Sequence, residues 1–217
     1  TVATPEETAV LTRLTFDEGR DVGARWSPDG TTIAFVSDRS GIDQVWLMDA
    51  DGGNPRALSQ GPAKHAWPEW HGDGQQLVCW AHHDGTHAIV VLAADGSGTT
   101  TVLSSLEPLE TPRWRPDGAS IAYGAVSGGN WDVWVTTPDG SRQWRLTADP
   151  AMESSPYWSP AGDMLAYKVA PGGQYSVTSP APLRSPACAA RRAAPVCAIP
   201  PLTTASCPRR CLYAAAW

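Results

Sequence analysis

Four short segments at a constant spacing decide the fold of this chain: WSPDG at residues 26–30, WHGDG at 70–74, WRPDG at 114–118 and WSPAG at 158–162. Each segment begins 44 residues after the one before it. The same spacing relates three sets of apolar positions, each of which marks a short β-prone run. The sets are Ile33, Leu77, Ile121 and Leu165; Val45, Ile89, Val133 and Val177; and Leu14, Leu58, Val102 and Leu146. A period in the forties with several short β runs per copy predicts an all-β chain, a β-propeller with one four-stranded blade per repeat.

The first copy shows how one repeat makes one blade. Its β-prone runs are predicted at residues 22–26, 33–36, 45–48 and 56–58. Pro28 presets the backbone of the turn after the first run, and Gly30 follows the preference of a type I turn for glycine at its fourth position. The segment DADGG at 49–53 is typical of a hairpin turn. Together these signals predict four strands that run alternately up and down.

Repeated in register, the pattern predicts about four blades near residues 21–59, 65–103, 109–147 and 153–177. Residues 10–15 match the fourth strand of a blade, although no blade precedes them. We therefore expect repeats over residues 10–178, with 10–15 as an outer strand that could complete the last blade and close the ring. A ring of four blades is at the low end for this fold, so the prediction is a partial propeller, and a closed ring of four blades is the alternative.

The composition changes abruptly after residue 178. Residues 179–217 contain no Asp, Glu, Gly or Lys, and they hold four of the five cysteines, Cys188, Cys197, Cys207 and Cys211. One hypothesis is a disulfide or zinc module, although the spacing fits poorly and no histidine follows. The favoured hypothesis is a non-native, disordered end such as a frame-shift product, because shifted G+C-rich codons give Arg, Pro, Ala and Cys.

The charge balance argues against some classes of partner. The net charge is −6, with −11 on residues 1–178 and +5 on 179–217. An acidic propeller is a poor candidate for nonspecific nucleic-acid binding, which needs a basic surface. The longest apolar run, residues 88–94, is far shorter than a membrane helix, so we expect no membrane span.

The repeated tryptophans and glycines have a structural explanation. A tryptophan ends each first strand at the same register, and we expect it to pack between adjacent blades, because large aromatic side chains dominate buried cores. The glycines end the turns that follow. The structural positions of the repeat are therefore predicted to be Trp26, Trp70, Trp114, Trp158, Gly30, Gly74, Gly118 and Gly162.

Two features suggest metal sites at first sight. All five histidines fall in the second repeat, namely His65, His71, His82, His83 and His87. Their positions around loops favour exposed loop histidines over a metal site, and the recurring Asp-Gly pairs favour hairpin turns over calcium loops. We therefore expect no metal and no cofactor. No Ser–His–Asp set, carboxylate pair or phosphate loop stands out, so we expect no enzymatic activity from this chain.

The best candidates for binding are positions at the mouth of the channel. The first strand of each blade lines the channel, and function on such scaffolds concentrates on loops and channel mouths. The loops that lead into these strands place Asp21, His65, Leu109 and Glu153 in register, and the strands themselves place Arg25, Glu69, Arg113 and Tyr157 in register. The alternative is that these are ordinary solvated polar positions.

The repeat resembles the TolB-type β-propeller repeat over about residues 10–178. The resemblance is carried by W-S-P-D-G, by I-A-F-V-S-D-R at 33–39, by V-W-L-M-D-A-D-G-G at 45–53 and by R-x-L at 56–58. It extends to the N-terminal propellers of prolyl-oligopeptidase-like serine peptidases. Members of these families usually have six or seven blades, whereas this chain supplies about four.

The resemblance implies two different functions. TolB-like proteins are periplasmic and non-catalytic, and they bind protein partners of the cell envelope, so a protein or peptide partner and an extracytoplasmic location are expected. In the peptidases, the propeller filters substrates for a hydrolase domain that carries a G-x-S-x-G motif. No G-x-S-x-G occurs in this chain, which makes the second possibility a gating propeller without its hydrolase.

Overall fold

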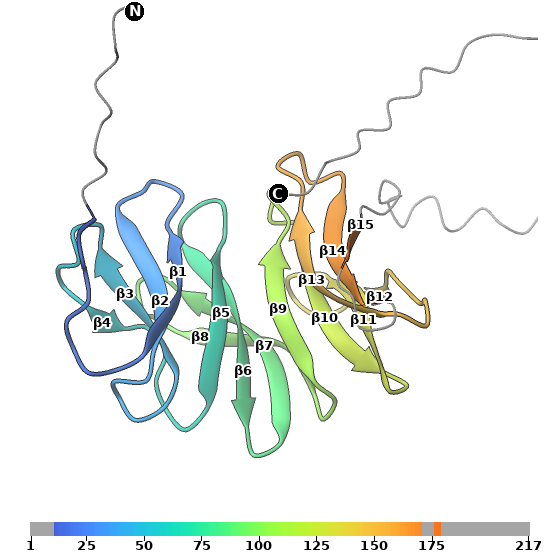
Figure 1. The fold of residues 1–217 in the computed structure, drawn as a ribbon, viewed down its shortest axis with the longest axis horizontal. Helices are drawn as coiled ribbons and strands as arrows, with labels where there is room; N and C mark the ends of the chain where they lie inside the picture. The colour runs from blue at the N-terminus through green and yellow to red at the C-terminus, as the bar shows by residue number, and fades with distance from the viewer. Residues whose placement is uncertain (1–10, 171–175, 179–217) are drawn as a thin grey trace, which may run out of the picture. The chain divides into compact units, whose positions relative to one another are not determined.

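The structure, a computed structural model, describes residues 11–170 and 176–178. These residues lie in the first of two compact units into which the chain divides, Thr1–Leu183. In the described ranges, fifteen β-strands form four antiparallel sheets, one for each repeat (Figure 1). No helix in these ranges is long and apolar enough to cross a membrane. The predicted all-β propeller fold is confirmed.

Each sheet follows the order of the chain. The first contains β1 (Asp21–Trp26), β2 (Thr32–Ser37), β3 (Gln44–Asp49) and β4 (Arg56–Ala57). The second contains β5 (Lys64–Trp70), β6 (Gln76–His83), β7 (Thr86–Ala93) and β8 (Thr99–Ser105). The third contains β9 (Leu109–Trp114), β10 (Ile121–Ser127), β11 (Asn130–Thr136) and β12 (Gln143–Arg145). The fourth contains β13 (Met152–Trp158), β14 (Leu165–Ala170) and β15 (Ser176–Thr178).

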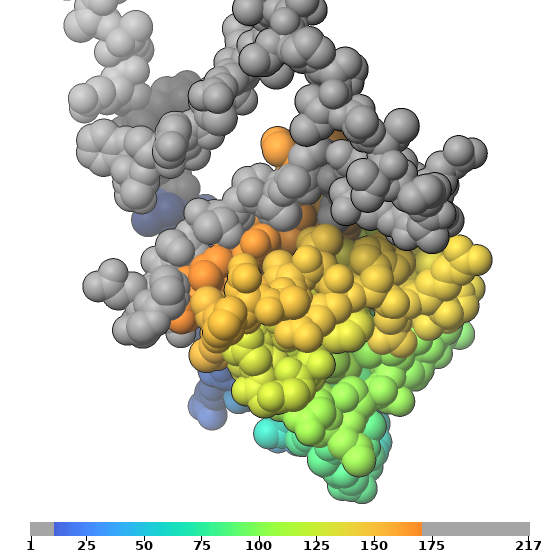
Figure 2. Space-filling view, turned by 90° about the vertical axis from the view of Figure 1, so that its right-hand side faces the viewer, coloured from blue at the N-terminus to red at the C-terminus, as the bar shows by residue number. Residues whose placement is uncertain are grey.

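Successive sheets touch through their first strands. β1 lies against β5, β5 against β9, and β9 against β13, so the four first strands form one continuous row (Figure 1). In the space-filling view, the third and fourth sheets form one packed surface (Figure 2). Each sheet is therefore a blade, and the first strand of each blade is its inner strand.

The turn after each inner strand follows directly from its sequence. The Gly30 amide donates to the Ser27 carbonyl over 2.9 Å, which is the hydrogen bond that closes a four-residue turn. Gly30 has φ near 71°, a conformation that costs glycine little because it has no Cβ. Equivalent hydrogen bonds close the turns at Gly74, Gly118 and Gly162.

Apolar side chains fill the space between neighbouring blades. Leu77 of the second blade packs with Ala34 and Leu47 of the first. Between the second and third blades lie Val78, Ile89, Trp114, Ile121 and Tyr123, and between the third and fourth lie Ala122, Val133, Val135 and Leu165. The cores thus lie between sheets. This is expected, because a blade can bury both of its faces only when a neighbouring blade packs on each side.

The expected outer strand at residues 10–15 is not formed. Residues 11–16 belong to no sheet, and residue 10 lies outside the described residues. Leu14 packs instead against Ile33, Phe35 and Met48 of the first blade. The segment therefore does not complete the fourth blade of its own chain, whose sheet has three strands in the described ranges. The predicted tail, residues 179–217, lies outside the described residues.

Candidate functional site

Every inner strand is interrupted by a β-bulge at the same register. The pairing with the second strand shifts between Val22 and Arg25 in the first blade, and similar shifts recur in the other three. The residues with positive φ at these bulges are Gly23 (66°), Trp67 (54°), Thr111 (44°) and Ser155 (52°), each 44 residues from the next. Such a conformation is unusual for a tryptophan or a β-branched residue. Bulges re-aim nearby side chains and often border functional sites.

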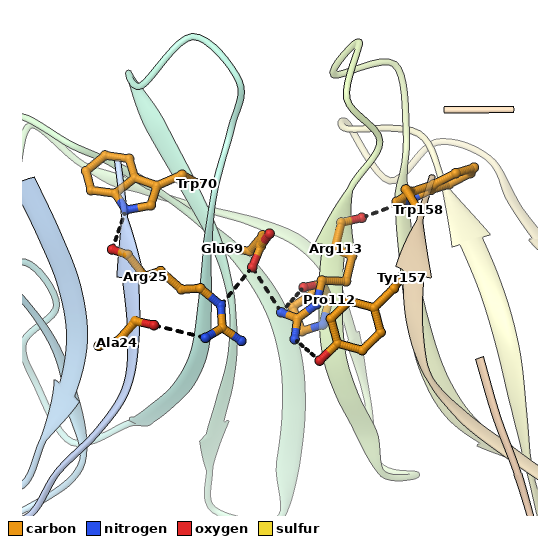
Figure 3. A network of polar contacts seen from close by, with 8 residues as sticks. All are labelled: Ala24, Arg25, Glu69, Trp70, Pro112, Arg113, Tyr157 and Trp158. Carbon is orange, nitrogen blue, oxygen red and sulfur yellow. Dashed lines mark hydrogen bonds and ion pairs between the residues drawn. The ribbon is translucent and has the colours of Figure 1, made fainter. Parts of the chain in front are cut away.

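Two residues after each bulge, the predicted mouth residues meet across the blades (Figure 3). The Nε of Arg25 donates to Oε2 of Glu69 over 3.2 Å, and Nη1 of Arg113 donates to the same oxygen over 3.3 Å. Nη2 of Arg113 donates to the Tyr157 hydroxyl over 3.2 Å. We call this set of four side chains, one from each blade, the inner-strand ladder.

The members of the ladder differ in exposure. Arg113 is 4% exposed, whereas Tyr157 is 49% exposed. The Arg113 guanidinium lies 4.7 Å from the centre of the Tyr157 ring, where a cation is attracted by the face of the ring. The hydrogen bond from Arg113 favours the phenolate and outweighs burial, so the pKa of Tyr157 lies below its usual value. Arg113 is thus a buried support, and Arg25 and Tyr157 are the accessible ends.

The three other polar residues predicted at the mouth, Asp21, His65 and Glu153, do not join the ladder. Asp21 forms a 3.0 Å ion pair with Arg39. Burial alone would raise the pKa of Asp21, but hydrogen bonds from Ser37, Arg39 and Thr15 outweigh it, and the pKa lies below its ordinary value. His65 and Glu153 are both buried in the described structure. The sequence pattern predicts one group of residues at the mouth, whereas the fold separates the ladder from Asp21, His65 and Glu153.

His65 and Glu153 occupy one register position with opposite chemistry. Burial lowers the pKa of His65, although its hydrogen bond to the Ala63 carbonyl opposes this shift. Burial raises the pKa of Glu153, and the nearby charges of Asp149 and Asp132 add to the effect. Burial thus disfavours the charged form of both groups. The expectation that the histidines are exposed loop residues is wrong for His65.

The repeated tryptophans lie beside the ladder, at the ends of the inner strands. The indole Nε1 of Trp70 donates to the Arg25 carbonyl over 3.1 Å, and that of Trp158 donates to the Arg113 carbonyl over 3.2 Å. Trp114 is 8% exposed, and its ring lies at 85° to the His71 ring, with the two ring centroids 4.8 Å apart. Trp26 has no described blade before it and is 58% exposed.

Three of the remaining aromatic groups of the second repeat gather on one face of the second blade. Trp80 and His82 are parallel within 2°, and the His82 and His87 rings lie 4.6 Å apart. Trp80 Nε1 donates to Nδ1 of His87 over 3.2 Å, which leaves the proton of a neutral His87 on Nε2 and neither nitrogen ready to bind a metal. In the part of the chain that the structure describes, no group of three or more His, Cys, Asp or Glu side chains is placed to hold a metal.

Chemically, the ladder offers charged and hydrogen-bonding groups. Its two arginines and one glutamate leave one positive charge, on a chain whose net charge is negative. No nucleophile–base pair or pair of catalytic carboxylates forms among its members. The fully buried thiol of Cys79 has a raised pKa because of desolvation, which keeps it in the unreactive neutral form.

Sequence reasoning found the ladder positions but missed the bulge that presents them. A signal was available, since the first repeat has a glycine, Gly23, at the position where the other repeats have Trp67, Thr111 and Ser155. A glycine in a strand often marks a bulge. Three larger residues at equivalent positions hid that signal, because none of them favours positive φ on its own.

Comparison with known proteins agrees with the fold. Residues 5–107 match the family model of the TolB beta propeller domain. An uncharacterized peptidase of Bacillus subtilis (strain 168), YuxL, is 44% identical over 57 residues, which are 24% of this chain and 9% of that protein. The matches span less than a fifth of the length of the curated relatives.

Two solved TolB structures share the architecture. TolB from Acinetobacter baumannii aligns with a TM-score of 0.67 at 20% identity, over 76% of this chain and 42% of that chain. The putative TolB from Agrobacterium tumefaciens aligns with a TM-score of 0.63 at 24% identity, over 68% of this chain and 53% of that chain. At these identities the likeness concerns the fold. Residues 5–107, which contain the first two of the repeated segments, therefore match the TolB-type β-propeller repeat, and the chain has a TolB-like β-propeller fold.

Proposed function

We propose that this chain is a non-catalytic, extracytoplasmic binding module that captures an anionic group of a protein or peptide partner at the inner-strand ladder. The observation that carries the proposal is the joining of four equivalent side chains, one per blade, into a polar row with an excess positive charge. The family resemblance supports a protein partner and an extracytoplasmic location, because TolB-like proteins act there by binding other proteins.

The ladder is suited to a carboxylate rather than to a cation. Glu69 is already shared by two guanidinium groups, so its oxygen is neutralised from both sides. Arg25 and Tyr157 remain partly exposed and can donate hydrogen bonds to an incoming group. Hydrogen bonds from arginine to a carboxylate are shorter and stronger than bonds between neutral groups. An acidic peptide segment is therefore the partner chemistry that this surface fits.

Fluorescence anisotropy with a fluorescein-labelled glutamate-rich peptide tests the proposal. We expect Arg25→Gln to weaken binding about tenfold, which corresponds to about 1.4 kcal/mol for one charged hydrogen bond. The matched control is Arg56→Gln, which removes an exposed arginine of β4 at the outer edge of the same blade. Binding that is equally tight in the Arg25→Gln variant, or equally tight to a glutamine-rich peptide, would contradict the proposal.

The second candidate function is a substrate-gating propeller of a serine peptidase. It is favoured by the 57-residue match to YuxL, which carries the name of a peptidase. A hydrolase domain would then belong to a longer protein. Labelling of this chain by a fluorophosphonate probe would contradict both functions, because neither gives the chain itself a nucleophilic serine.

A further inference from the structure

The face of the first blade that points away from the second blade carries Trp26, Ile33, Phe35 and Met48, and we call it the outer face of the first blade. Its residue types are those of an interface between blades. At the two interfaces where Trp70 and Trp158 lie, the indole donates to a backbone carbonyl of the preceding blade. Trp26 holds the same register and is 58% exposed, although it ends an inner strand in the same way. The chain therefore displays one interblade tryptophan without the blade that would cover it in the described ranges.

The N-terminal segment already occupies part of the missing neighbour's position. Leu14 packs against Ile33, Phe35 and Met48. One repeat later, Leu58, the residue after β4, packs against the cluster of the second blade that includes Cys79 and Leu92, the equivalents of Phe35 and Met48. Leu14 thus lies where the fourth strand of a preceding blade would place its leucine.

The backbone agrees with this assignment. A Cβ added to Gly52 would lie 2.8 Å from the Leu14 carbonyl oxygen, and a Cβ added to Gly140 would collide with the Val102 carbonyl oxygen. Gly52 and Gly140 are equivalent hairpin glycines, and Val102 belongs to the fourth strand of the second blade. On the first blade, the segment around Leu14 therefore occupies the position of a neighbour's fourth strand, while the first three strands of such a neighbour are missing from the described ranges.

The fourth blade offers the complement. In the described ranges its sheet has three strands, β13, β14 and β15, and no outer strand. Leu165 packs toward the third blade, so Ala166, the next residue on β14, points to the opposite face. Ala34 and Ala122 hold the same register as Ala166, and both lie in interblade clusters. The fourth blade thus has the first three strands of a blade, and the segment around Leu14 holds the position of a fourth strand.

We infer that the outer face of the first blade binds the fourth blade of a second copy of this chain, head to tail. The segment around Leu14 would lie against β15 of that copy as its outer strand. Trp26 Nε1 would donate to the carbonyl of Tyr157 of the second copy, as Trp158 Nε1 does to the Arg113 carbonyl. Arg25 would lie beside that tyrosine and extend the inner-strand ladder. Such a heterologous interface closes a ring or propagates, according to its rotation.

Sedimentation velocity of the full chain over a hundredfold range of concentration tests the inference. A reducing agent is kept in all samples, so that the cysteines of residues 179–217 cannot cross-link the copies. We expect the unmodified chain to self-associate, and we expect Trp26→Arg and the milder Trp26→Ala to weaken association at least tenfold. Leu106→Arg is the control, because Leu106 is the most exposed large apolar side chain among the described residues that lie outside this face and outside residues 11–16.

A mixing experiment then decides the orientation. Ala166→Arg blocks the fourth blade and leaves the first blade free, whereas Trp26→Arg does the reverse. For a head-to-tail interface, each variant is monomeric alone, and an equimolar mixture forms a one-to-one complex. Self-association of Ala166→Arg alone would indicate pairing of two first blades and would overturn the inference. So would a monomeric unmodified chain, or equal association of the chain and Trp26→Arg.

Discussion

Trp114 and Trp26 hold the same position of the repeat but lie in different surroundings. Trp114 is 8% exposed in the core between the second and third blades, whereas Trp26 is 58% exposed on the outer face of the first. Both follow from the same five-residue motif and the same turn. The difference shows that the motif specifies a strand end and a turn by itself, while its contribution to stability depends on a neighbouring blade.

The largest expected effect separates these two tryptophans. Trp114→Ala should lower the free energy of unfolding by about 3–5 kcal/mol, because it leaves a large cavity in a packed core. Trp26→Ala should cost less than about 1 kcal/mol in the monomer, as is usual for exposed side chains. Urea unfolding of both variants at low protein concentration measures the difference. Equal losses would show that the two environments do not differ as the structure indicates.

The next effect concerns the ladder. Glu69→Gln removes the carboxylate that pairs with the buried Arg113 guanidinium, and we expect a loss of about 1–3 kcal/mol, because an under-paired buried charge is costly. Asp43→Asn is the matched control. It removes the exposed ion pair between Asp43 and Arg20, at 2.8 Å, and should cost about 1 kcal/mol or less. An equal or smaller loss for Glu69→Gln would mean that the ladder does not support the inner strands.

A smaller, pH-dependent effect is expected at His65. The pKa of His65 is lower in the folded chain than in the unfolded chain, so the unfolded state binds the proton more readily. Stability is therefore highest above the ordinary histidine pKa and decreases as the pH falls through it toward the lower folded value. Thermal unfolding between pH 7.5 and 5 should show less of this decrease in His65→Gln. The exposed His83 gives a control, His83→Gln, that should follow the unmodified chain.

The opposite dependence is expected at Glu153, which holds the same register. Its pKa is raised in the folded chain, so the folded state favours the protonated form and loses stability as the pH rises through that value. Glu153→Gln should therefore be more stable than the unmodified chain at pH 7.5, and the difference should shrink in acid. Glu107→Gln, at an exposed position, should change neither. A Glu153→Gln variant that is less stable at pH 7.5 would contradict a dominant effect of burial.

Much of the fold could be predicted from the sequence because its signals are local and repeated. The 44-residue spacing, the Pro-Asp-Gly turns and the apolar runs predicted the strands of each blade, and the resemblance to TolB-type repeats is confirmed. The prediction of an outer strand at residues 10–15 was wrong, although the apolar pattern of these residues matches that of a fourth strand. In the structure, Leu14 keeps the packing of that strand without its hydrogen bonds.

The candidate site was less accessible to prediction for a physical reason. Equivalent positions in a repeat have equal backbone geometry but not equal burial, which depends on what each neighbouring blade supplies. Register placed Arg25, Glu69 and Arg113 together, and the structure shows the bonds between them. Register also placed His65 and Glu153 at an accessible rim, where the fold instead buries both. No local pattern distinguishes these two cases.

The most direct test of this account is the hydrogen exchange of the indole Nε1–H groups, measured by NMR on a dilute, monomeric sample. The account predicts slow exchange at Trp70 and Trp158, which donate to carbonyls of the preceding blade, and fast exchange at the exposed Trp26. Protection of Trp26 equal to that of Trp70 in the monomer would contradict it, because the first blade would then already have a covered outer face.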